Sequence, residues 1–291
     1  MPCQGRRGGC LARLLSHRHP RHASCTASSS SDKYAARSLD HGNAIFLLVR
    51  QTGVLRHVRG CHGNSYHPAY RRLSPLSNRV DSIRFDTAGF TFQREGDNTR
   101  VWLTPDGDPV GLFHFAIKPD IPAALDSIDA LRAFSRSATA AAGGAIIEVE
   151  TVSVDRSLAL RQIIKVPQQP HGMTYVGSIL LPFRDFSFVI KVHGQERGTT
   201  GVRDAVVLDE SFGDGRVQVD AESKTLRGWM QDPYDPAVRD GFSRNLAESA
   251  EYDARFPNHP LSRLRRTLAH LQRTIQVGDD VRRSPPFVFA Q

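Results

Sequence analysis

The stretch from Met173 to Asp209 constrains the fold more than any other part of the chain. Its middle alternates with a period of two, which is typical of a strand with one face on a hydrophobic core. One side carries Phe186, Phe188, Ile190 and Val192; the other carries Ser187, Lys191 and His193. Because the Lys191 side points away from that core, we expect it to tolerate substitution. Upstream, residues 174–181 are apolar on both sides, which predicts a central strand covered on both faces.

Charge and cysteine content divide the chain into two parts. Residues 1–80 contain thirteen Lys and Arg but only two acidic residues, whereas residues 81–291 contain twenty-five basic and twenty-eight acidic residues. All four cysteines and seven of the twelve histidines also precede residue 81. We therefore predict a basic extension, residues 1–80, and a single globular domain, residues 81–291.

The extension shows neither helical nor strand periodicity, which predicts disorder. Its longest apolar stretch, Ile45 to Val49, is too short to cross a membrane. Its Arg-rich, Ser-rich, acid-poor composition fits an organelle transit peptide in outline. Its charge is also compatible with nonspecific contact with polyanions through phosphate groups. A further hypothesis, for a bacterial source, is that translation begins at Val80, so that the residues before it lie upstream of the working protein.

The cysteines do not predict a metal site or a disulfide framework. Structural zinc sites bring cysteines in pairs two to four residues apart. Here Cys3 and Cys10 are seven apart, and Cys25 and Cys61 stand alone. No fold is expected around them for disulfides to cross-link. We predict no metal and no cofactor.

From residue 81 the pattern predicts strands and helices in the order of an α+β domain. Strands are expected over 82–92 with a break at Gly89, and over 101–103, 110–117, 145–154 and 158–166, before the pair within 173–209. Helices are expected over 122–142, from about 202 to 209, over 237–253 and over 260–276. In the second helix, Val202, Ala205, Val206 and Asp209 share a face, and Thr199 or Thr200 could cap it. Because βαβ alternation is missing, we predict an antiparallel or mixed sheet with helices packed on its faces.

The order of helix 122–142, strands 145–194 and helix 260–276 resembles an α/β/α sandwich superfamily. It is shared by PsbP, the extrinsic protein of photosystem II, and a Ran-binding nuclear import factor. The phrases KVPQQPHGMTYVGSILLPFRDFSFVIKVHGQERGTTGVRDAVVLD and GWMQDPYDP are also similar to those of an uncharacterised bacterial group. The resemblance implies binding to other proteins, because the superfamily's known members mostly act in that way.

The loop after the second long strand, residues 193–204, is the candidate binding site. Its residues are His193, Glu196, Arg197, Thr199, Thr200, Arg203 and Asp204. A glycine-bearing turn at a helix start, with arginines nearby, could bind an anion through free backbone N–H groups. The alternative is that the charged residues pair with each other and tie the loop to the sheet edge. The loop has neither P-loop nor dinucleotide-binding spacing.

Two classes of function stay open. The first is a soluble, noncatalytic protein-binding module that offers a sheet face, a sheet edge or the loop to a partner. The second is an enzyme or anion-binding protein with His193 as acid or base, Glu196 orienting it, and Arg197 or Arg203 holding an anionic substrate. Because no catalytic signature is present, we favour the binding module. We expect the protein in the cytoplasm.

The first prediction concerns the domain boundary. Every periodic element lies within residues 81–291, so a fragment of those residues should fold alone. Circular dichroism and thermal melting would compare the fragment with the full chain. We expect the same cooperative transition in both; its loss on truncation would contradict the boundary.

Overall fold

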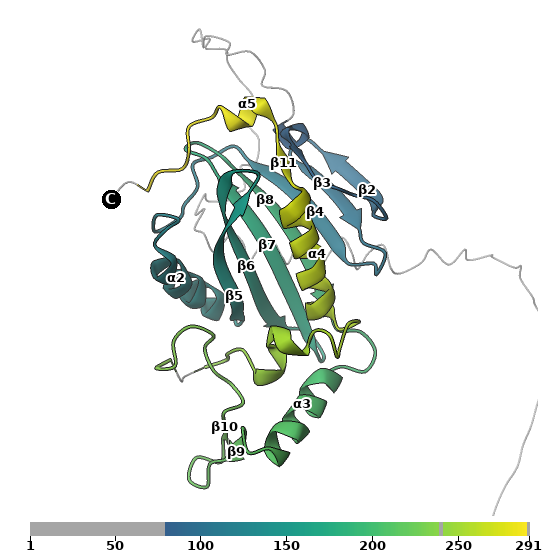
Figure 1. Ribbon diagram of the computed structural model, residues 1–291, viewed down its shortest axis with the longest axis vertical. Helices are drawn as coiled ribbons and strands as arrows, with labels where there is room; N and C mark the ends of the chain where they lie inside the picture. The colour runs from purple at the N-terminus through teal and green to yellow at the C-terminus, as the bar shows by residue number, and fades with distance from the viewer. Residues whose placement is uncertain (1–78, 239–240, 290–291) are drawn as a thin grey trace, which may run out of the picture.

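The structure is a computed structural model that describes residues 79–238 and 241–289 (Figure 1). Expectations for the extension, including its disorder, targeting, cysteines and polyanion contacts, fall on residues 1–78 and so lie outside the described residues. Val80 is described, and its side chain is fully buried. No helix in the described ranges is long and apolar enough to span a membrane.

Seven strands form one antiparallel sheet in the order β2-β3-β4-β8-β7-β6-β5. Their bounds are β2 Thr91–Gly96, β3 Thr99–Leu103, β4 Pro109–Phe115, β5 Ala145–Val154, β6 Ser157–Pro167, β7 Met173–Pro182 and β8 Ser187–Gln195. The α+β class is therefore confirmed, and every strand pair in this sheet is antiparallel. The strands predicted over 145–154 and 158–166 match β5 and β6 almost residue for residue.

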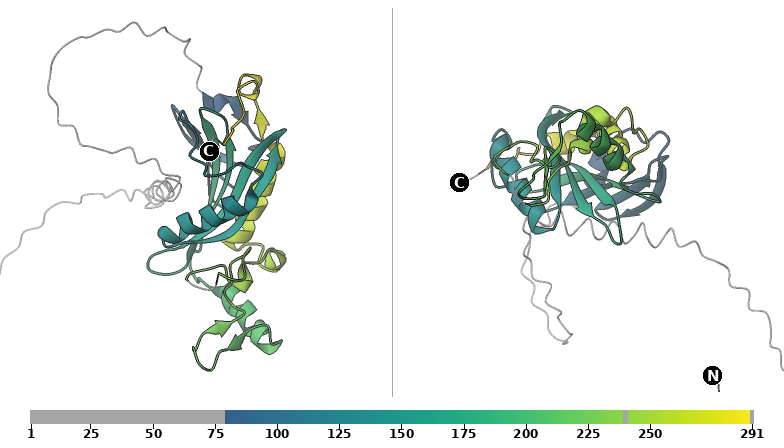
Figure 2. Two further views of the ribbon diagram at one scale, coloured as in Figure 1. Left: turned by 90° about the vertical axis from the view of Figure 1, so that its left-hand side faces the viewer. Right: turned by 90° about the horizontal axis from the view of Figure 1, so that it is seen from below.

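Helices cover both faces of this sheet (Figures 1 and 2). Helix α4, Pro260–Thr274, crosses one face, and helix α2, Ile128–Ala141, lies on the other. As predicted, β7 is covered on both faces: Tyr175 and Ile179 join the core on the α4 side, and Val176 and Leu180 join the core on the α2 side.

Strand β8 occupies the centre of the sheet, and its alternation is confirmed. Phe188, Ile190 and Val192 are buried in the α4-side core. The opposite side is buried too, which corrects the expectation that it tolerates substitution. Lys191 is only 1% exposed, and its Nζ lies 5.5 Å from the centre of the Phe113 ring. A period of two distinguishes the faces of a strand but does not tell which face is solvated.

Helix α4 packs closely on the sheet because a glycine lies beneath it. Four leucines of the helix are fully buried: Leu261, Leu264, Leu268 and Leu271. A Cβ atom on Gly177 of β7 would lie 2.5 Å from Leu268 Cδ1 and 2.8 Å from Leu264 Cδ2. The predicted helix 260–276 is thus confirmed at its start, with Pro260 as its first residue and His259 as its N-cap, but it ends earlier, at Thr274.

Helix α2 begins later than the predicted range 122–142. Its N-cap is Ser127, and residues 116–127 form an irregular segment before it. Ile121, Ala123 and Leu125 of that segment are buried in the α2-side core. These apolar residues are therefore part of the core although they are not helical. Their spacing is the reason why the predicted helix starts too early.

Two other predicted elements differ from the structure. The predicted strand 82–92 is broken at Gly89 as expected, and the φ of 80° at this glycine lies in the left-handed region. Its first part, β1 Ile83–Arg84, leaves the main sheet and pairs with β11 Gln276–Val277. The predicted helix 237–253 is largely irregular where described, with short 3-10 helices η2 Leu246–Glu248 and η3 Ala250–Tyr252.

Helix α3, Val202–Gly213, lies beyond one end of the sheet (Figure 2). The small hairpin β9 Gln218–Val219 and β10 Leu226–Arg227 follows it. A third, smaller core joins this region: Val207, Val217, Trp229, Ala247 and Tyr252. The remaining described elements are the 3-10 helix η1 Arg79–Ser82 and helix α5 Asp279–Arg282.

The close approach under α4 gives the second prediction. Gly177→Ala should lower the free energy of unfolding by about 1–3 kcal/mol, because the added methyl group overpacks two buried leucines. Gly96→Ala on the edge strand β2 is the matched control. A Cβ there meets no atom within 4 Å, so the change should stay within about 0.5 kcal/mol. Chemical denaturation measures both, and equal values would contradict the packing.

Candidate functional site

The loop between β8 and α3 is fixed by the carboxylate of Glu196. Its Oε2 accepts a hydrogen bond from the backbone N–H of Met173 at 2.9 Å, and its Oε1 accepts one from Gly201 at 2.9 Å. The ring of His259 lies beside it, with Nε2 3.6 Å from Oε1. Burial alone would raise the pKa of Glu196, but His259 and the two N–H groups outweigh it and lower that pKa. The carboxylate of Glu196 thus already accepts the hydrogen bond of the Gly201 N–H, which a bound anion would need.

Arg203 is held inside the protein rather than facing a ligand. It is 1% exposed, and all of its nitrogens donate hydrogen bonds. Nε donates to Ala247 O at 2.6 Å, Nη2 to Ser249 O at 2.9 Å, and Nη1 to Asp253 Oδ1 at 3.0 Å and Ser262 Oγ at 2.8 Å. This set joins α3 to the turns before α4. Arg203 therefore has a structural position, and an anionic substrate could reach it only after these bonds broke.

Asp204 connects α3 to the 3-10 helix η2. Its Oδ2 accepts a hydrogen bond from Nδ2 of Asn245 at 2.9 Å, and Asn245 is also the N-cap of η2. Burial and the nearby charges of Glu248 and Glu196 raise the pKa of Asp204 to about 6, although Lys165 and Asn245 act against them. Asp204 is thus a carboxylate whose charge is costly in the folded protein.

A buried ion pair lies next to Asp204. Lys165 Nζ of β6 donates to Glu248 Oε2 at 2.7 Å, and both side chains are 1% exposed. The Tyr175 hydroxyl donates to Glu248 Oε1 at 3.3 Å, and Asn245 N donates to Oε2 at 2.8 Å. Burial raises the pKa of Tyr175 well above its usual value. Sequence reasoning missed this cluster, because Lys165 and Glu248 are 83 residues apart.

His193 does not face the rest of the loop. It lies on the α2-facing side of β8 with Lys191, whereas Glu196 is held at the start of the β8–α3 loop by Met173 and Gly201. His193 is 2% exposed, and burial, with the charge of Lys191, lowers its pKa to about 4. Burial also lowers the pKa of Lys191 to about 7. Glu196 therefore does not orient His193 as the enzymatic alternative requires.

The other loop residues are at the surface. Arg197 and Thr199 are exposed, and Thr200 is half-buried. The N-cap of α3 is Gly201, with φ of 73° and no side-chain capping bond, so neither threonine caps the helix as predicted. In the candidate binding loop, some residues are thus buried in the fold and others lie in an exposed turn. The seven residues do not converge on one ligand position.

The predicted face of helix α3 is present, but it points to solvent. Arg203, Val207 and Ser211 are its buried residues. Val202 is 49%, Val206 37% and Phe212 41% exposed, and Ala205 and Asp209 are exposed with them. The sequence pattern correctly placed Val202, Ala205, Val206 and Asp209 on one face, but an apolar stripe at helical spacing ordinarily marks a buried face.

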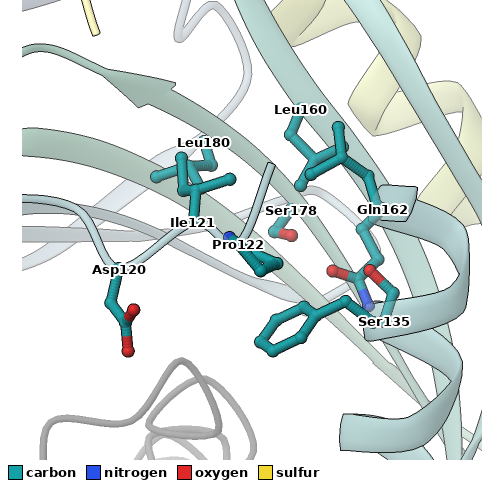
Figure 3. A pocket seen from close by; sticks show the side chains of 10 residues that line it. Asp120, Ile121, Pro122, Ser135, Leu160, Gln162, Ser178 and Leu180 are labelled. Atoms are coloured by element: carbon teal, nitrogen blue, oxygen red, sulfur yellow. The ribbon is translucent and has the colours of Figure 1, made fainter. Parts of the chain in front are cut away.

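Two hollows of the described structure lie next to α2. One of about 40 Å³ lies between α2, the segment before it and the sheet, with Ser135, Gln162 and Ser178 among apolar neighbours (Figure 3). It is far below the volume of a typical small-molecule site. A larger one, about 350 Å³, lies at the end of α2 and is lined by three charged residues. Two of them, Arg136 and Asp232, bind each other at 2.6 and 2.8 Å, and the third is Arg244. No group of three or more metal-ligating side chains occurs among the described residues.

Comparisons with known proteins do not assign the chain to a family. No protein-family model matches it, and no curated protein matches it. A crystal structure of a protein from Bacteroides thetaiotaomicron VPI-5482 is similar at 7% sequence identity with a TM-score of 0.29. The similar part covers 43% of this chain and 42% of that chain.

The third prediction tests the charge of Asp204. A raised pKa means that the folded protein binds a proton at higher pH than the unfolded chain does, so stability falls as pH rises from about 4 to 6. Asp204→Asn should therefore raise the free energy of unfolding at pH 7 by on the order of 1 kcal/mol, and the gain should vanish near pH 4.

Denaturation across that pH range measures the effect, with Asp209→Asn on the exposed side of the same helix as control. The control should change stability by under about 0.5 kcal/mol at every pH. Loss of stability in Asp204→Asn at pH 7 would instead mean that Asn245 needs a charged acceptor.

Proposed function

We propose that this chain is a noncatalytic protein-binding module and that the exposed side of α3 is its partner surface. The observation that carries the proposal is the stripe of Val202, Ala205, Val206 and Phe212, which the described structure leaves in solvent. Contiguous exposed apolar residues mark interaction sites more often than scattered ones do. The expected resemblance to the PsbP-like superfamily favours the same class of function.

The stripe belongs to a helix that is already held in place. Arg203 bonds the inner side of α3 to the turns before α4, and Asp204 bonds it to Asn245. Val207 packs in the small third core. Because the helix is fixed before any partner arrives, binding costs little ordering of the surface.

The chemistry of the surface indicates the kind of partner. Asp209 is exposed on the same side, between Val206 and Phe212 along the helix, and forms no ion pair with a described residue. A partner helix with apolar residues at three- and four-residue spacing and one basic residue would match this pattern. The basic residue would fix the register by pairing with Asp209 at the rim, where charge adds specificity more than affinity.

The test is site-specific photo-crosslinking from Val206 in the native cells. Leu158, 54% exposed at the far tip of the β5–β6 hairpin, is the control position. We expect an adduct from Val206 but not from Leu158, with a protein that contributes an amphipathic helix. Binding of that helix, made as a peptide, should weaken at least tenfold in Val206→Asp and stay unchanged in Leu158→Asp.

Two results would overturn the proposal. One is a partner helix whose binding is indifferent to Val206→Asp. The other is an adduct between two copies of this chain, which would replace a separate partner by self-association. Thermal melting of both variants shows whether the fold is intact, because both positions are exposed and substitution there should leave the core unchanged.

A further inference from the structure

The two edge strands of the main sheet, β5 and β2, differ in how far other parts of the chain bond to their outer backbone groups. At the β5 edge, the backbone N–H of Val149 donates to the Tyr234 hydroxyl at 2.6 Å, and the Val149 carbonyl accepts from Arg132 Nε at 3.2 Å. Glu150, the next residue of β5, is bonded by both of these side chains. Side chains thus occupy the outer backbone groups of Val149, in the middle of this edge, and hinder another strand from pairing there.

The β2 edge has no comparable cover. All six residues of Thr91–Gly96 are exposed, and β3 is the strand's sole partner among the described strands. Beyond β3, the described residues provide one hydrogen bond to its backbone, from the strand's own Gln93 amide to Thr91 O at 3.4 Å. The outer N–H and C=O groups of β2 are therefore available for a further strand.

A β-bulge gives the two sides of β2 different chemistry. Phe92 is opposite Trp102, but Arg94 is opposite Val101, so Gln93 is an extra residue and Phe92 and Arg94 fall on opposite faces. Phe92 is 53% exposed, and its ring packs edge-on at 6.2 Å from Trp102, which in turn contacts Phe85 at 5.1 Å. One face therefore offers an open aromatic surface.

The opposite face offers an unpaired positive charge. Arg94 is exposed and forms no ion pair with a described residue. Glu95, its neighbour in sequence, is on the Phe92 face and is bound by Arg100 Nε at 2.9 Å and Nη2 at 2.8 Å. The acidic residue nearest to Arg94 in the sequence is thus already paired. The positive charge of Arg94 is therefore left for a partner to match.

We propose that β2 binds an extended segment of a partner protein as an eighth strand of the sheet. The segment places an aromatic or large apolar side chain beside Phe92 and an acidic side chain beside Arg94, on alternate faces. A second copy of this chain fits less well, because antiparallel pairing of two β2 strands about Gln93 and Arg94 brings two Arg94 side chains onto one face. The site is separate from α3 and does not depend on the function proposed for that helix.

The experiment selects ligands for the full-length chain from a phage-displayed library of random ten-residue peptides. We expect enriched peptides to alternate an aromatic or large apolar residue with an acidic one, without proline between them. Phe92→Ser should weaken their binding at least tenfold. Arg94→Glu should weaken it similarly and should select basic peptides from the same library. Arg184→Glu, on a side chain 61% exposed at the β7–β8 turn, should leave binding unchanged.

Backbone N-methylation separates strand addition from ordinary surface adhesion. Two versions of a selected peptide would carry methyl groups on alternate amides, one version for each set. An added strand directs only one set of amides toward β2, so one version should lose binding and the other should keep it. The proposal is overturned if no peptide is enriched, if both versions bind equally, or if Arg94→Glu leaves the selected sequences unchanged. Val206→Asp should have no effect, which keeps this result independent of α3.

Discussion

The ion pair of Lys165 and Glu248 joins strand β6 of the main sheet to the 3-10 helix η2 beyond its end. A buried pair is stable only when its remaining hydrogen-bonding groups are satisfied. Here Tyr175 and Asn245 bond the Glu248 carboxylate, and the Lys165 ammonium lies 4.4 Å from the centre of the Phe242 ring. Removing one member would leave a buried charge without a partner. The pair thus determines where η2 lies, and η2 in turn contacts α3 through Asn245.

The main sheet and its covering helix could be predicted because their sequence obeys simple periods. Residues 186–192 alternate because Phe188 and Ile190 point to one core, and the leucines of α4 recur because they follow a single helical stripe. The both-faces-buried pattern of 174–181 correctly identified β7 as an inner strand. Such patterns are local, so a single sequence is enough to show them.

The candidate site could not be predicted in the same way, because its contacts are long-range and polar. Arg203 is the clearest case: an arginine at helical spacing ordinarily marks the solvent side, yet here it is buried against backbone carbonyls supplied by residues 247 and 249. That inversion turns the apolar stripe outward. Likewise, His193 and Glu196 are three residues apart, but Glu196 is bound by Met173 and Gly201 whereas His193 is buried beside Lys191. Neither sequence distance nor residue type carries this information.

The position of α4 in the chain also affects how the protein can be made. Strand β8 is complete at Gln195, but the helix that covers it ends at Thr274. At about 5–20 residues per second, a ribosome needs roughly 4–16 s to add those residues. During that interval the nascent chain holds a sheet whose larger apolar face has no helix over it. We therefore expect chaperones to bind the growing chain until α4 emerges, and we expect a chain that stalls before Pro260 to be prone to aggregation.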